Sequence, residues 1–104
     1  MIVEERNYTM VPGGVAEYLR LWEECGRASQ VAHLGEPLGV YRTEVGELNT
    51  LVYLWRYESL RDREKRRGAL AADPGFAAFR RRVRDLLVAQ ENRILAEAAP
   101  GGTK

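Results

Sequence analysis

Three aromatic side chains recur at every second position of the segment LVYLWRYESL. They are Tyr53, Trp55 and Tyr57, and the spacing places all three on one face of a β-strand. Large rings with polar tips either fill a buried face or line a small-molecule pocket. Arg6 and Tyr8 have the same spacing near the N-terminus and add a cation and a phenol. Together these five residues predict binding of a small aromatic or carboxylated molecule, gripped by a bidentate guanidinium.

Arg6 also has an interpretation that needs no ligand. A guanidinium is costly to bury unless an acidic group compensates its charge. Glu4 or Glu91 could be that group, and the aromatic rings would then only fill the protein interior. The sequence leaves both interpretations open.

A second set of candidates could perform acid–base chemistry. Glu91 and Arg93 flank Asn92 in the segment LVAQENRIL. A buried glutamate can act as a general base and an arginine can stabilise an enolate, although a structural Glu–Arg pair is more common. Asn92 joins the predicted ligand-binding set. His33 is the only histidine, and without an orienting carboxylate we interpret it as a helix-end or loop residue.

The sequence contains no histidine and cysteine cluster, so we expect no metal site and no cofactor. The basic runs around Arg66 and Arg81 stand beside acidic residues, and we interpret them as solvated helix faces. Sixteen Lys and Arg against fifteen Asp and Glu leave a net charge of +1. This balance does not favour a nucleic-acid partner.

The sequence predicts a cytoplasmic protein. Its single cysteine, Cys25, cannot form an internal disulfide and fits a reducing compartment. No apolar run approaches the roughly 20 residues that span a bilayer, and the N-terminus lacks the pattern of a signal peptide. We therefore expect neither secretion nor a membrane partner.

The elements that position these residues follow from periodicity and from turn and cap signals. Strands are predicted over residues 2–10, 38–45, 48–57 and 87–95, with a hairpin around Gly46. Helices are predicted over residues 15–29 and 61–72, with a further helical segment that starts at Pro74 and is capped by Asp73. The order βαββαβ predicts an α+β ferredoxin-like fold, an antiparallel sheet with two helices on one face. We expect one domain over residues 1–97 and a flexible tail over residues 98–104.

Helices on one face of the sheet leave the other face bare. We expect Val52 and Leu54 to face the helices, so that Tyr53, Trp55 and Tyr57 point to the bare face. Such an apolar patch is rare on a monomer, and a second copy of the chain is the simplest cover.

Several segments resemble the NIPSNAP family in order and spacing. The resemblance runs from about residue 2 to residue 95, and its most specific part is GELNTLVYLWRYESLRDRE. It implies a dimeric α/β barrel in which two sheets face each other. Relatives often carry histidine in place of Tyr53, so chemistry that depends on that histidine is not expected here.

The resulting hypothesis is a homodimer that binds a small aromatic or carboxylated molecule between its two sheets. Two alternatives belong to other classes. One is a cofactor-independent oxygenase or isomerase, and the other is a module for protein–protein interaction.

Overall fold

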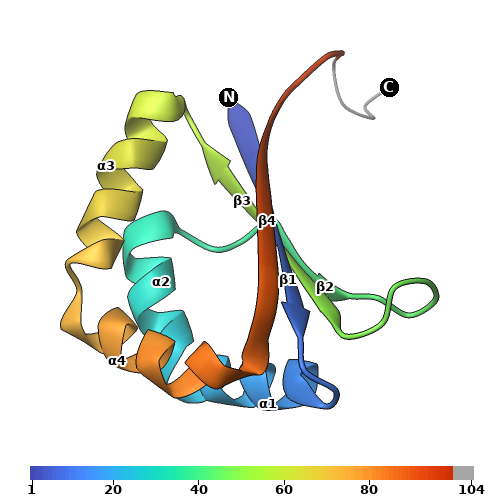
Figure 1. Ribbon diagram of the computed structural model, residues 1–104. Helices are drawn as coiled ribbons and strands as arrows, with labels where there is room; N and C mark the ends of the chain where they lie inside the picture. The colour runs from blue at the N-terminus through green and yellow to red at the C-terminus, as the bar shows by residue number, and fades with distance from the viewer. Residues whose placement is uncertain (100–104) are drawn as a thin grey trace.

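The computed structural model describes residues 1–99 and contains a four-stranded antiparallel sheet with helices on one face (Figure 1). The strands are β1 (Ile2–Met10), β2 (Gly39–Arg42), β3 (Thr50–Tyr57) and β4 (Leu87–Ala96). Their spatial order is β2-β3-β1-β4. This is the ferredoxin-like topology, so the predicted fold class is confirmed. Most of the predicted flexible tail lies outside the described residues.

The helical elements occupy the two predicted positions between strands. The first is α1 (Gly14–Leu21), a π-helical turn (Trp22–Gly26) and α2 (Arg27–Leu34); the second is α3 (Leu60–Ala71), α4 (Pro74–Val83) and a 3-10 turn (Arg84–Leu86). Both predicted caps are present. Ser59 accepts a hydrogen bond from the Asp62 N–H, and Asp73 accepts from the N–H groups of Gly75 and Phe76. The first helical stretch continues past the predicted end, so that His33 lies in the last turn of α2.

The hairpin between β2 and β3 is looser than the sequence predicts. Strand β2 has only four residues, and residues 43–49 form a loop that projects from the sheet (Figure 1). Val45 at its tip is 92% exposed. Asn49 closes the loop with a φ of 63°, a left-handed conformation that asparagine tolerates better than most residues. A strand prolonged into this segment would have gained no packed face, because no helix covers it.

The predicted direction of the strand β3 rings is wrong. Tyr53, Trp55 and Tyr57 are at most 1% exposed and face the helices. The Tyr53 ring lies edge-on to Trp22, with 5.1 Å between the ring centroids. Val52, on the opposite parity, lies on the face without helices. The physical reason is volume, because wide rings are needed to fill the space between a sheet and the helices above it.

Strand β4 runs beside β1 at the edge of the sheet (Figure 1). Every residue of β4 after Leu87 is exposed. The helices therefore cover β1 and β3 but leave a gap next to β4, between this strand and the helices α3 and α4.

The π-helical turn brings Gly26 against the ring of Phe79 on α4. A Cβ atom at Gly26 would lie 2.8 Å from two ring carbons, too close for a normal contact. Gly68 on α3 has nothing within 4 Å of the same position. The two glycines therefore differ in packing space.

We expect Gly26→Ala to destabilise the fold by about 1–3 kcal/mol, because the buried Phe79 ring has no room to move. Gly68→Ala is the matched control and should stabilise the fold by about 0.5–1 kcal/mol, since alanine favours an exposed helix position. Urea denaturation of both variants measures the difference. Equal effects in the two variants would contradict the packing of α4 on the π-helical turn.

Candidate functional site

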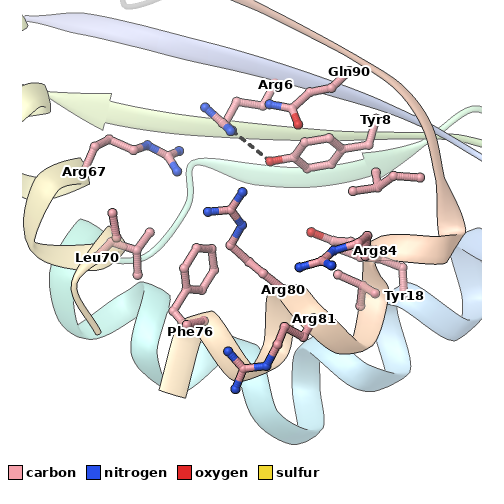
Figure 2. Close-up of a pocket in the computed structure, with 14 residues that line it drawn as sticks. Arg6, Tyr8, Tyr18, Arg67, Leu70, Phe76, Arg80, Arg81, Arg84 and Gln90 are labelled. Carbon is pink, nitrogen blue, oxygen red and sulfur yellow. Dashed lines mark hydrogen bonds between the residues drawn. The ribbon is translucent and has the colours of Figure 1, made fainter. Parts of the chain in front are cut away.

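The gap beside β4 contains a pocket of about 530 Å³, in the range of small-molecule sites. Its walls come from β1, β4, α1, α3 and α4 (Figure 2). Within residues 1–99, five arginines line it and no acidic residue does. They are Arg6, Arg67, Arg80, Arg81 and Arg84.

Three of these arginines converge. Figure 2 shows the guanidinium groups of Arg6 from β1, Arg67 from α3 and Arg80 from α4 pointing toward one another, whereas Arg81 points away. The Tyr8 hydroxyl lies next to the Arg6 guanidinium, beside the space where the three groups meet. Three strongly basic groups from separate elements therefore meet in one space.

The remaining wall of the pocket is apolar. Tyr18, Leu70, Phe76, Val83 and Leu87 contribute rings and aliphatic chains to it. On α4 the positions of Phe76, Arg80 and Val83 follow helical spacing, so the cation sits within an apolar stripe. The pocket combines a cationic end with an apolar wall.

The carboxylate of Glu4 contacts two of the arginines at the cationic end of the pocket. Its side chain is completely buried, and Arg6 Nη1 and Arg63 Nη2 each donate to its Oε2 at 2.8 Å. Arg67 Nε lies 3.4 Å from Oε1, and the Tyr57 hydroxyl donates to the same oxygen at 3.2 Å. Burial alone would raise the pKa of Glu4, but the hydrogen bond from Arg63 and the charges of Arg67 and Arg6 outweigh it and lower the pKa to about 2. Glu4 is therefore a carboxylate at any physiological pH.

Glu4 does not use all the donors around it. Arg67 Nη2 is buried and has no hydrogen-bond partner among the described residues. Arg80 forms no ion pair with any carboxylate within residues 1–99. The unpaired charge of Arg80 and the absence of acidic lining residues within residues 1–99 suit an anion.

The structure brings together part of the predicted ligand set. Arg6 Nε donates to the Tyr8 hydroxyl oxygen at 2.8 Å, and both side chains line the pocket. Asn92 pairs with Arg6 across β1 and β4, and its amide lies against Glu4 and Arg6. Glu4, not Glu91, is the acidic partner of Arg6.

The other three predicted ligand-binding residues lie behind the pocket. Tyr53, Trp55 and Tyr57 do not line it and form part of the core. Trp55 still influences the site, because the Arg67 guanidinium lies 5.8 Å from the centroid of its ring. Their role is support and not contact with a ligand in this pocket.

The predicted catalytic candidates lie elsewhere. Glu91 and Arg93 are on the face without helices, where they line a polar depression of about 750 Å³ and Arg93 pairs with Glu5 at 3.0 Å. His33 Nε2 lies 2.9 Å from Asp73 Oδ2. The sequence interpretation missed this orienting carboxylate because it is 40 residues away in the chain. The pair joins α2 to the cap of α4 and does not line the pocket.

Sequence reasoning missed the helix arginines of the site. Arg67, Arg80 and Arg84 belong to basic runs that we interpreted as solvated faces. Arg80 and Arg84 are exposed as expected, whereas Arg67 is largely buried and contacts Glu4. The interpretation missed that all three also line a pocket. Arg67 stands three and four residues before Leu70 and Ala71, and Arg80 stands four after Phe76. A cation in phase with apolar neighbours on a helix is the signal that could have indicated a pocket wall.

Neither a metal site nor a membrane-spanning helix is found in the described part of the chain. No three His, Cys, Asp or Glu side chains of residues 1–99 gather in a way that could hold a metal ion. None of the helices in this range has the length and apolar character needed to cross a membrane.

The topology and the pocket define a ferredoxin-like α+β protein with a cationic site beside its edge strand. The chain belongs to the NIPSNAP family, whose model matches residues 3–100. A human relative, NipSnap homolog 3B, is 34% identical over an alignment of 102 positions that covers 94% of this chain and 40% of that protein. The chain thus spans less than half the length of the curated relatives it matches.

Solved structures agree with this assignment. A NIPSNAP family protein from Agrobacterium tumefaciens is 41% identical, with a TM-score of 0.92 over 99% of this chain and 98% of its own. At the level of fold alone, the chain is similar to a dimeric ferredoxin-like protein from an uncultured marine organism (9% identity, TM-score 0.77, covering 99% and 92% of the two chains). It is also similar in fold to a proposed antibiotic biosynthesis monooxygenase from Nitrosomonas europaea (10% identity, TM-score 0.68, covering 95% and 100%).

The Glu4 cluster makes a prediction about stability and pH. A folded pKa of about 2 against an ordinary value of 4.5 means that ionised Glu4 stabilises the fold above pH 4.5 by roughly 3 kcal/mol, and that this stabilisation is lost as the pH falls toward 2. Glu4→Gln should cost about 3–5 kcal/mol at pH 7, because it leaves three guanidinium groups without their counter-charge.

Urea denaturation at pH 7, 5 and 3 tests this expectation. The difference in unfolding free energy between the wild type and Glu4→Gln should be equal at pH 7 and 5 and smaller at pH 3. Glu64→Gln, on the exposed side of α3, is the control and should stay close to the wild type at each pH. A pH-independent difference for Glu4→Gln would contradict an ionised Glu4.

Proposed function

We propose that this NIPSNAP family protein is a homodimer that binds a small anionic molecule with an apolar body. The single observation that carries the proposal is the convergence of Arg6, Arg67 and Arg80 in a pocket that no acidic side chain of residues 1–99 lines. The proposed site lies between the sheet and the helices. It replaces the predicted site between two sheets, because Arg6 and Tyr8 face the helix side.

The electrostatics of the pocket support an anion. Guanidinium groups that converge repel one another, and a bound carboxylate would exchange this repulsion for charge-assisted hydrogen bonds. A hydrogen bond to a charged group contributes about 1.5–3 kcal/mol. The apolar wall around Phe76 and Leu70 then discriminates against small, fully hydrated anions.

Binding can be tested with two ligands of the same shape and opposite charge. 2-Naphthoate should bind in isothermal titration calorimetry, whereas 2-naphthylmethylamine should not, because the pocket repels a cation. Arg80→Met should weaken 2-naphthoate by about fivefold to tenfold, equal to roughly 1–1.4 kcal/mol. Arg81→Met removes the same charge from the neighbouring residue that points away, and should change the affinity by less than twofold.

Other outcomes separate the alternatives. Equal binding of the two ligands would refute an anion site. Failure of both, and of a wider thermal-shift screen of aromatic acids, would favour the protein-interaction module.

The proposed homodimer rests on the sheet face that no helix covers. Val3, Val52, Leu54 and Leu95 place apolar side chains on this face, and Tyr41 beside them is 57% exposed. Glu5, which pairs with both Leu54 and Arg93 in the sheet, interrupts these apolar residues with a charged group. A second copy of the chain supplies an equally mixed surface, and the dimeric neighbour of the same fold supports this occupant.

We expect Leu54→Glu to convert a dimer into a monomer, because it places one charge from each copy at a closely packed interface. Leu60→Glu is the control, since Leu60 is 59% exposed at the start of α3 on the helix side. Sedimentation velocity measures the assembly state. An unchanged dimer in Leu54→Glu would place the interface elsewhere.

A cofactor-independent oxygenase or isomerase remains the alternative function. The fold shared with the proposed monooxygenase supports it only as an analogy. Of the predicted catalytic candidates, Glu91, Arg93 and His33 all lie outside the pocket. Tyr8 is the residue placed to exchange a proton with a ligand there.

A further inference from the structure

The arrangement of hydrogen-bond donors in the pocket favours one kind of anion over others. We propose that the natural ligand presents a phosphate monoester, as the dianion, to Arg6, Arg67 and Arg80. This inference rests on the proposed function, because it names the chemical class of the anion that the same pocket binds.

The first argument is charge. Within residues 1–99, Glu4 is the one carboxylate in contact with the converging group, and Arg6, Arg63 and Arg67 already share it. Arg80 adds a fourth guanidinium group with no carboxylate of its own, which leaves an excess of three positive charges. A ligand carboxylate would neutralise one of them. A phosphate monoester carries close to two negative charges at neutral pH and matches the excess better.

The second argument is the direction of the donors. Arg6, Arg67 and Arg80 approach from a strand and two different helices (Figure 2). A carboxylate offers two oxygens in one plane, which a single guanidinium fork satisfies. A phosphate monoester offers three terminal oxygens in a tetrahedral arrangement, so that each oxygen can meet a different arginine.

Tyr8 supplies a further donor at the same end of the pocket. The Tyr8 oxygen accepts from Arg6 Nε, and its own proton is donated to no other side chain of residues 1–99. The Tyr8 hydroxyl is therefore positioned as an additional donor to the phosphate.

The apolar wall defines the rest of the ligand. Phe76, Leu70 and Val83 line the pocket beside the cationic end, and its volume of about 530 Å³ exceeds what a phosphate alone fills. The ligand is therefore a phosphorylated molecule with an apolar body and not free phosphate.

The experiment compares probes that differ only in the head group. Calorimetry at pH 7.5 should show 2-naphthyl phosphate binding at least tenfold more tightly than 2-naphthoate, and at least tenfold more tightly than inorganic phosphate. Because the second phosphate pKa is about 6, the preference over 2-naphthoate should fall to about threefold or less at pH 5. The ratio at each pH cancels changes in the protein, whose only histidine, His33, lies outside the pocket.

Arg80→Met should reduce the affinity for 2-naphthyl phosphate by a larger factor than that for 2-naphthoate, with Arg81→Met as the control. The inference is overturned if 2-naphthoate binds as tightly as the phosphate ester at pH 7.5. It is also overturned if the preference does not change with pH, or if inorganic phosphate binds equally well. In these cases an anion still binds and the proposed function stands, whereas absence of binding by every anion refutes both.

Discussion

The buried carboxylate of Glu4 is the constraint on which the rest of the structure depends. Its side chain is fully enclosed, yet its pKa of about 2 keeps it ionised, so compensating cations must lie within contact distance. Arg63 and Arg67 come from α3, Arg6 comes from the same strand as Glu4, and Tyr57 comes from β3. One carboxylate therefore fixes where α3 sits on the sheet and brings arginines to the edge of the pocket.

The aromatic core enables this arrangement. Across β1 and β3, Trp55 pairs with Glu4 and Tyr53 pairs with Arg6. The rings of Tyr53 and Trp55 are parallel, with 5.9 Å between their centroids. Rings of this size exclude water from the lower side of the ion cluster, which strengthens each electrostatic contact. Strand β3, whose aromatic residues predicted a binding surface, therefore packs against the ion cluster instead.

Local signals in the sequence predicted the elements well, because they depend on neighbours in the chain. Strand β1 begins and ends as predicted, and the caps at Ser59 and Asp73 form. The direction of the β3 rings depends instead on the distance of the helices from the sheet, and periodicity does not encode that distance. Prediction of the site would have required the same knowledge of helix packing, since Arg67 and Arg80 come together only after α3 and α4 have packed.

Arg6 and Arg67 link the proposed ligand binding to folding. Arg6 and Arg67 contact Glu4 on one side and border the pocket on the other. An anion in the pocket would relieve the repulsion between arginines that Glu4 alone compensates only in part, and would thereby tighten α3 against the sheet. Because a ligand that binds only the folded state stabilises it, occupancy of the pocket and docking of α3 must favour each other. Arg80 is exempt from this coupling, since it makes no contact with Glu4. The three converging arginines therefore comprise an inner pair tied to the fold and an outer one, Arg80, which under the proposed function contacts the ligand alone.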